Sequence, residues 1–206
     1  KVYSITFLDK FLFGNKSLIM EKLPSDYLDY NLLSDYFQED CRMKCKRYDI
    51  EESPFDYWKS NKEKVVALAI KNYGKINVYT MREALYQATS ECTSFRPTIM
   101  VSLIKMFKAT TILDFSAGWG DRLIGAMAAG VDFYCGIDPN SCLHPNYDKM
   151  INFFGQDKKK FKMIHSPFEK AKVPKKKYDL ICTSPPYFSL ERYSEESTQS
   201  ISSNDD

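Results

Sequence analysis

Residues 111–122 read TILDFSAGWGDR, a short apolar run that leads into small residues and two glycines. The run over 111–115 has the length of a buried strand, and a helical pattern of apolar residues follows from Leu123 to Ala129. Gly130, directly after this pattern, is a typical helix stop. A buried strand that turns at once into a helix is the first half of a parallel β/α unit. This stretch therefore predicts an α/β fold.

Three more strand candidates continue the same alternation. They are residues 133–137, 162–164 and 178–182, with a helix from about Tyr147 to Phe154 between the first two. Strands that alternate with helices at this spacing form a doubly wound parallel sheet with right-handed crossovers. We therefore predict such a sheet for the second half of the chain.

The first 90 residues carry a different pattern. Alternating apolar residues over 1–20 favour strands or a hairpin. Apolar residues at helical spacing predict three helices, from Ser25 or Asp26 to Tyr36, over 64–70 and over 80–90. Ser53 is a further cap candidate, and Gly74 is the predicted stop of the second helix. We therefore predict a mostly helical accessory region over 1–90 and an α/β core over 91–206, which opens with a buried helix over 99–107.

Length and composition limit the classes of protein to consider. The 206 residues suffice for one full domain with a small helical extension. A net charge of +2 confines any nucleic-acid surface to a local patch. No apolar run reaches the length of a membrane span, and no signal peptide opens the chain. We therefore predict a soluble protein in a cytoplasmic or nuclear-type intracellular compartment, with no membrane partner.

The six cysteines are scattered along the chain, at Cys41, Cys45, Cys92, Cys135, Cys142 and Cys182. Several lie within apolar runs, which is typical of reduced, buried thiols. We therefore predict no disulfides. Cys41 and Cys45 have the spacing of half a zinc site, but no second Cys or His pair follows at ligand spacing, so we predict no metal.

Small or polar residues follow each predicted strand, at the edge of the sheet where ligands bind. Gly118 and Gly120 after the first strand let the backbone approach a ligand, beside the N-terminus of a helix. Asp138 after the second is placed to bind the vicinal hydroxyls of a ribose. Residues 165–169 follow the third strand and residues 183–188 the fourth. The sequence therefore predicts a ligand site at this edge.

Each of these features alone has a simpler explanation. A Gly-x-Gly pair is more often a tight turn, and an acid after a strand is more often a helix cap. The third glycine of a dinucleotide fingerprint is missing, and bulky Trp119 argues against a close-packed pyrophosphate. A nucleoside ligand without pyrophosphate fits better. The loop TSPPYF over 183–188 combines two rigid prolines with projecting aromatic rings, which suits a flat polar group.

Three motifs in order carry a resemblance to a known family. DFSAGWG over 114–120, GIDPN over 136–140 and TSPPYF over 183–188 resemble the class I S-adenosylmethionine-dependent methyltransferases that modify exocyclic amines. The resemblance is in particular to the DNA N6-adenine and N4-cytosine methylases of phages and large viruses, over about residues 93 to 193. The resemblance implies a Rossmann-like fold, S-adenosylmethionine as cofactor, DNA in preference to RNA as partner, and a location inside a virus- or phage-infected host cell.

The resemblance also implies roles for individual residues. In the catalytic loop, the Ser184 side chain and the Pro185 carbonyl would accept the two amine hydrogens, Pro186 would stiffen the turn, and Tyr187 would stack on a flipped-out base. The cofactor residues would be Arg96 with its helix over the methionine end, Asp114 at the ammonium group, Ser116, Gly118 and Gly120 along the passage, Asp138 at the ribose, and Ser166 and Phe168 beside the adenine. Glu169 is a candidate substitute for the acidic residue usual in that third motif.

Several alternatives stay open at this point. The chain could instead be an RNA or protein amide N-methyltransferase, or a non-catalytic cofactor-binding or scaffold subunit. Nine lysines over 158–177 are either solvated surface or a phosphate-contacting edge beside the active site. The family sheet has more strands than this sequence shows, which predicts truncation after residue 206 in preference to permuted N-terminal strands or a partner chain.

Overall fold

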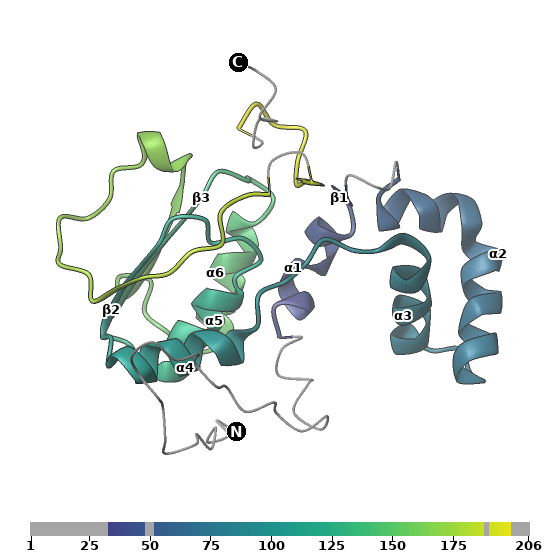
Figure 1. Ribbon diagram of the computed structural model, residues 1–206, viewed down its shortest axis with the longest axis horizontal. Helices are drawn as coiled ribbons and strands as arrows, with labels where there is room; N and C mark the ends of the chain where they lie inside the picture. Colours follow the sequence, from purple (N-terminus) through teal and green to yellow (C-terminus); the bar gives the residue numbers. More distant parts are fainter. Residues whose placement is uncertain (1–32, 48–51, 188–189, 199–206) are drawn as a thin grey trace, which may run out of the picture.

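The computed structural model describes residues 33–47, 52–187 and 190–198 (Figure 1). The elements are α1 (Asp35–Arg42), β1 (Lys46–Arg47), α2 (Pro54–Tyr73), α3 (Val78–Thr89), α4 (Pro97–Phe107), β2 (Thr111–Asp114), α5 (Asp121–Ala129), β3 (Phe133–Asp138), α6 (His144–Phe153), β4 (Phe161–His165), the 3₁₀ turn η2 (Phe168–Lys170), β5 (Leu180–Ile181) and β6 (Glu191–Arg192). The strands or hairpin predicted over 1–20 and the helix start at Ser25 or Asp26 lie outside the described residues.

The main sheet has four strands in the order β4-β3-β2-β5, and each neighbouring pair is parallel. The prediction of an α/β fold with a parallel sheet is therefore confirmed. The register places Asp114 beside Gly136 and Asp138 beside His165. Because all four strands run the same way, their carboxyl ends share one edge of the sheet.

The two faces of the sheet are covered differently. Ile112 and Tyr134 point into a core formed with α4, α5 and α6, which lie together on one side of the sheet (Figure 1). Leu113 and Cys135 point to the opposite face, where the segment 171–178 covers them. That segment contains Pro174 and a run of lysines instead of a helical apolar pattern, and it has no helix. After η2, the β4–β5 connection therefore crosses the second face without a helix.

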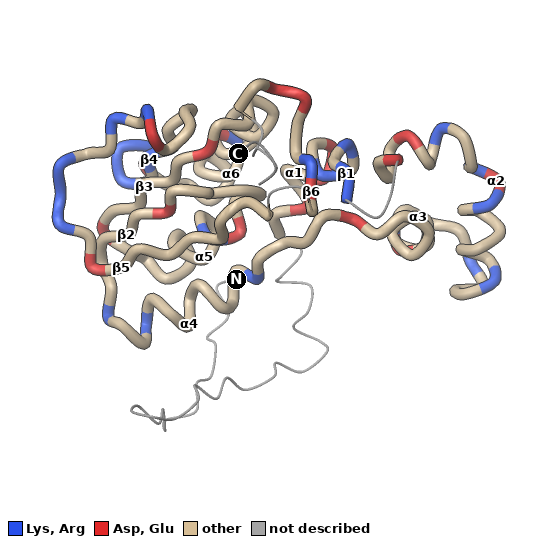
Figure 2. Tube along the Cα trace, turned by 45° about the horizontal axis from the view of Figure 1, so that its top comes forward, with Lys and Arg blue, Asp and Glu red and all other residues tan. Residues whose placement is uncertain are grey.

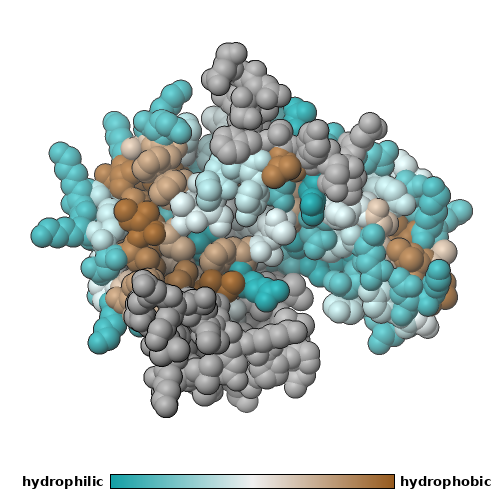
Figure 3. Space-filling model, viewed as in Figure 1, coloured by the Kyte–Doolittle hydropathy of each residue, from teal (hydrophilic) through white to brown (hydrophobic). Residues whose placement is uncertain are grey.

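Helices α2 and α3 form a hairpin with its own small core of Val65, Ala69, Ala84 and Leu85. Ser53 caps α2 by accepting a hydrogen bond from the Asp56 N–H, and Gly74 ends it at a φ of 65°, so both predicted boundaries are confirmed. The hairpin lies at the far end of the molecule from the sheet (Figure 1), and hydrophobic atoms are exposed there among hydrophilic ones (Figure 3).

Helix α1 packs against the α/β core, although it precedes residue 90. Cys41 and Cys45 belong to the same buried cluster as the residues of α5 and α6. Arg82 of α3 forms ion pairs with Asp35 and Glu39 of α1, so α1 also connects this core to the α2–α3 hairpin.

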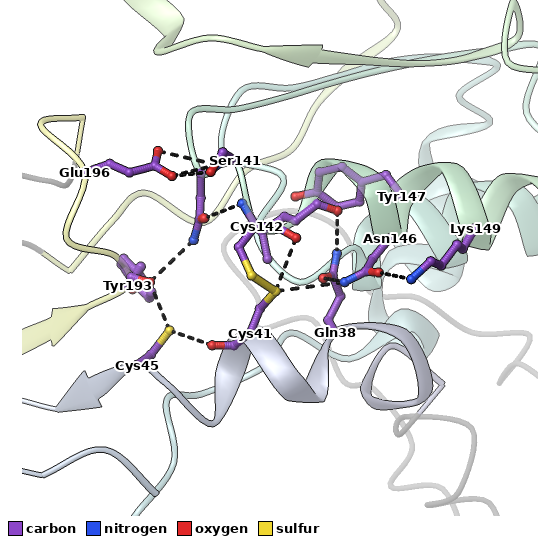
Figure 4. Close-up of a disulfide and its surroundings, with 12 residues drawn as sticks. Gln38, Cys41, Cys45, Ser141, Cys142, Asn146, Tyr147, Lys149, Tyr193 and Glu196 are labelled. Carbon is purple, nitrogen blue, oxygen red and sulfur yellow. Dashed lines mark hydrogen bonds between the residues drawn. A yellow bond between two sulfur atoms is a disulfide. The ribbon is translucent and has the colours of Figure 1, made fainter. Parts of the chain in front are cut away.

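Cys41 and Cys142 form a disulfide across 101 residues, with their Cα atoms 6.2 Å apart (Figure 4). The prediction of no disulfides is therefore wrong. Among the described residues, the other four cysteines are free thiols. Spacing along the chain gave no signal for this pair, because only the packing of α1 on the loop after β3 brings the two residues together.

Two further properties concern the described residues alone. None of their helices combines the length and the hydrophobicity that a membrane span requires. Their His, Cys, Asp and Glu side chains form no group of three or more suited to a metal ion.

Candidate functional site

A cavity of about 400 Å³ opens at the carboxyl edge of the main sheet. All four strands contribute the loops that follow them. The residues lining it are Thr93, Ser94, Phe95, Phe115, Ser116, Ala117, Gly118, Trp119, Asp121, Arg122, Asp138, Pro139, Asn140, Leu143, Pro167, Phe168, Glu169, Ser184, Pro185, Pro186, Tyr187, Tyr193, Ser194 and Thr198. Six of the lining residues carry aromatic rings and three carry carboxylates, so the cavity suits a flat ligand with polar groups.

The loop after β5 brings the four predicted catalytic residues together. Ser184, Pro185, Pro186 and Tyr187 all line the cavity. The Tyr187 side chain is on the rim, since the residue is 45% exposed. A ring in that position is available to a ligand that enters from solvent.

Arg122, at the start of α5, connects the loops after β2 and β5. Its Nε donates to Asp114 Oδ2 at 2.7 Å, and its Nη1 donates to Ser184 Oγ at 2.8 Å. Its Nη2 donates to the Ser116 carbonyl, and the Phe95 ring lies over the guanidinium, 5.2 Å from ring centre to Cζ. Burial acts to lower the pKa of Arg122, but the Asp114 carboxylate outweighs it and leaves the pKa raised, so the guanidinium stays charged.

Asp114 is fully buried behind Arg122 and does not line the cavity. Its Oδ2 also accepts a hydrogen bond from the Tyr134 hydroxyl at 2.7 Å. The structure therefore places Asp114 as the partner of a buried cation and leaves Arg122 as the group that faces the cavity.

Asp138, at the end of β3, holds two loops of the site. Its Oδ2 accepts from the Gly118 N–H at 2.8 Å, and its Oδ1 accepts from the Asn140 N–H at 2.9 Å. Burial raises the pKa of Asp138 to about 6, while these two hydrogen bonds act in the opposite direction. The carboxylate lines the cavity and is charged above that pH.

Gly118 and Gly120 have different surroundings. Gly118 has a φ of 57° and lines the cavity, with only the Ser116 carbonyl, 3.8 Å away, near the position of a Cβ. Gly120 has a φ of 85° and does not line the cavity; a Cβ there would lie 2.8 Å from Met150 Sδ and 3.4 Å from a Tyr147 ring carbon. Gly120 therefore allows α5 to approach α6.

Gly120→Ala is expected to lower the free energy of unfolding by about 2–4 kcal/mol, because the steric clash adds to the cost of a left-handed backbone. Gly118→Ala carries only the backbone cost, about 1–2 kcal/mol. Urea denaturation of the two variants measures both losses. Equal losses would show that the contact with Met150 is unimportant.

The loop after β4 contributes Pro167, Phe168 and Glu169 to the cavity. Phe168 stacks on Phe115 with ring centres 4.7 Å apart, which gives the cavity an aromatic wall. Ser166 does not line the cavity, and its hydroxyl donates to the Pro167 carbonyl at 2.9 Å. Ser166 therefore shapes this loop.

Arg96 is exposed at the N-terminus of α4 and does not line the cavity. The three residues before it do, at Thr93, Ser94 and Phe95. Glu191 holds this segment, since its Oε1 accepts from the Thr93 N–H at 3.0 Å and the Thr93 hydroxyl at 2.9 Å.

Sequence reasoning missed the residues that the segment 190–198 contributes, which are Tyr193, Ser194 and Thr198. Strand β6 pairs antiparallel with β1. The Tyr193 carbonyl accepts from Cys45 Sγ at 3.1 Å and from Asn140 Nδ2 at 3.4 Å (Figure 4). No motif marks this stretch, and its partner strand lies far away in the sequence, so no local pattern could have found it.

Arg122 and Asp121 were also missed. Asp121 accepts a hydrogen bond from the Ser34 hydroxyl at 2.5 Å, and burial raises its pKa to about 7. Two charged residues directly after a glycine turn are the only sequence signal for them, and charges at a helix start are ordinarily explained by the helix dipole.

The lysine run is not the edge of this cavity. Residues 158–160 precede β4 and residues 175–177 precede β5, so these lysines lie at the amino ends of the strands, opposite the cavity. Figure 2 shows Lys and Arg residues at the sheet end of the molecule and also along β1 and α2. Only Lys170 and Lys172, at and after η2, follow a loop that lines the cavity. The hypothesis of a continuous phosphate-contacting edge beside the site is therefore wrong for most of the run.

No protein-family model matches this chain, and no curated protein matches it.

Proposed function

We propose that this chain has a Rossmann-like class I methyltransferase fold, binds S-adenosylmethionine in the cavity and transfers its methyl group to an exocyclic amine of a DNA base, N6 of adenine or N4 of cytosine. The observation that carries the proposal is the meeting of the Ser184–Tyr187 loop with Asp138 and Gly118 in one cavity. The setting proposed with it is the interior of a virus- or phage-infected cell.

The strand order supports this fold. From β2 the chain moves outward through β3 to β4 and then returns to β5 on the other side of β2. The order reverses between β2 and β5, and open parallel sheets bind ligands outside the carboxyl ends of the strands at such a switch point. The cavity lies at that edge.

The residues of the cavity fit a nucleoside cofactor. Asp138 presents a carboxylate that can accept from ribose hydroxyls, and Phe168 offers a ring for the adenine. Gly118 leaves room for the cofactor beside the backbone. A volume of about 400 Å³ is in the range of small-molecule sites.

Bound S-adenosylmethionine supplies a methyl group on a positively charged sulfur. The amine of a base is a weak nucleophile because its lone pair is delocalised into the ring. In this proposal Ser184 and the Pro185 carbonyl orient the amine, and Tyr187 stacks on the extruded base. Transfer would form the N–C bond as the S–C bond of the cofactor breaks, and the surplus amine proton would leave to water.

Cofactor affinity is expected to fall as the pH drops below about 6, by up to about tenfold per unit, because protonation removes the Asp138 charge. Because folding raises this pKa, ionisation of Asp138 lowers the free energy of unfolding of the ligand-free protein as the pH rises from about 4 to about 6. Calorimetric titration between pH 5 and pH 8 measures the affinity, and Asp138→Asn should bind more weakly without this slope. A midpoint near 7 that disappears in Asp121→Asn would assign the effect to Asp121 instead.

Transfer of labelled methyl from S-adenosylmethionine to duplex DNA, single-stranded DNA, RNA and protein tests the function. The proposal predicts label in adenine or cytosine of DNA. Label in RNA or in a protein amide would identify the alternative enzymes. Failure of all substrates together with no cofactor binding by calorimetry would favour a scaffold subunit.

A further inference from the structure

We infer that Arg122 is a positioning residue that makes the Ser184 hydroxyl a hydrogen-bond donor toward the substrate. The site then accepts neutral amines that have a hydrogen-bond acceptor, a ring nitrogen or a carbonyl oxygen, next to the amine-bearing carbon. This inference rests on the proposed amine methylation, and it specifies which amines qualify.

Arg122 is held firmly in place. The side chains of Arg122 and Asp114 are 4% and 0% exposed, and their ion pair spans 2.7 Å. The Ser116 carbonyl accepts a second N–H of the guanidinium, and the Phe95 ring covers its face. These contacts fix the plane of the guanidinium, and one N–H of Nη1 then points to Ser184 Oγ at 2.8 Å.

The direction of this hydrogen bond is unambiguous. A guanidinium has no acceptor and does not deprotonate in proteins, so Arg122 donates and Ser184 accepts. The bond takes one lone pair of the hydroxyl oxygen. A cationic donor also draws electron density from that oxygen, which weakens it as an acceptor and strengthens its own O–H as a donor.

The hydroxyl hydrogen of Ser184 has no acceptor within the described part of the chain. Ser184 lines the cavity, so this hydrogen is available to a ligand. An amine placed against the Pro185 carbonyl would donate one N–H there, and the adjacent acceptor atom would then receive the Ser184 hydrogen.

This pair of contacts defines a substrate class. Adenine has an amine beside N1, cytosine has an amine beside N3, and a carboxamide has an amine beside its oxygen. A lysine-type amine has no such acceptor, and its ammonium form would be repelled by the nearby Arg122. The site therefore selects amidine- or amide-type amines.

Single-stranded oligonucleotides with one target base test the inference in the full chain. Adenine is compared with 1-deazaadenine, and cytosine with 3-deazacytosine. The wild type should methylate the deaza base that matches its target about 10–100-fold more slowly, the usual effect of losing a charge-assisted hydrogen bond. Replacing the ring nitrogen by C–H makes the amine more electron-rich, so a slower reaction cannot come from a poorer nucleophile.

Two variants assign the effect to the residues. Ser184→Ala should slow the natural base but leave natural and deaza bases within about threefold of each other. Arg122→Lys retains the charge but cannot reach three acceptors at once, and it should lose most of the preference while it still binds S-adenosylmethionine. Arg82→Lys is the matched control and should keep the full preference, because this partly buried arginine pairs with Asp35, Glu39 and Glu83, none of which lines the cavity.

Equal rates of the wild type on natural and deaza bases would overturn the inference, and so would a preference that survives Ser184→Ala. If S-adenosylmethionine binds but neither natural oligonucleotide is methylated, the proposed amine methylation of DNA fails and this inference fails with it. That outcome is distinct from methylation without preference, which overturns the inference alone.

Discussion

Ser184→Ala is expected to lower kcat by about 10²–10³-fold while it changes the dissociation constant for S-adenosylmethionine by no more than about twofold. Ser184 lies on the loop proposed to face the substrate amine, and its one protein partner in the described chain is Arg122. Its loss removes a contact proposed to orient the base that carries the reacting amine, and it leaves the Asp138 side of the cavity intact. Single-turnover methyl transfer measures kcat, and calorimetry measures cofactor binding.

Asp138→Ala is the matched comparison for that variant. It removes the carboxylate proposed to hold the ribose, together with the acceptor for the Gly118 and Asn140 N–H groups. The dissociation constant for S-adenosylmethionine should rise at least about tenfold. If Ser184→Ala and Asp138→Ala weaken cofactor binding equally, the division between catalytic loop and cofactor loop is wrong.

Cys142→Ser is expected to lower the free energy of unfolding by about 3–5 kcal/mol, since the disulfide to Cys41 closes a long loop. The two cysteines are 101 residues apart in sequence, so the crosslink excludes many expanded conformations of the unfolded chain. Urea denaturation without reductant gives the difference directly.

Reduction provides the control for the disulfide. The wild type in excess dithiothreitol should denature like Cys142→Ser, and the variant itself should not respond to the reductant. If the oxidised wild type and Cys142→Ser have the same unfolding midpoint and slope, the crosslink contributes nothing to stability.

The sequence was sufficient to predict the β/α half of the molecule. Strands β2, β3 and β4 and helices α5 and α6 follow the ranges that apolar periodicity predicts. This works because each of these elements is defined by a few neighbouring residues. The Ser184–Tyr187 loop, Asp138 and Gly118 line one cavity because parallel strands necessarily bring their carboxyl ends together, and their roles stay predictions.

The remaining features depend on contacts between distant parts of the chain. Nothing near Arg122 in sequence indicates that it reaches Ser184, 62 residues further on. The pairing of β1 with β6 and the Cys41–Cys142 bond likewise join segments that have no shared pattern. Sequence reasoning also placed Asp114 and Gly120 at the ligand, whereas their roles follow from the bulky neighbours that surround them.

The pairing of β1 with β6 determines how the molecule can be divided. Tyr193, Ser194 and Thr198 line the cavity, and their segment is held by Lys46, Arg47 and Cys45, which precede the α2–α3 hairpin in the chain. A fragment that starts at residue 91 would retain every recognisable motif, but it would lose β1 and the Cys45 thiol, which contact the segment with Tyr193, Ser194 and Thr198. We therefore expect a stable fragment to need α1 and β1 together with the α/β core, and deletion of α2 and α3 with a short linker is the dissection that retains the β1–β6 pairing.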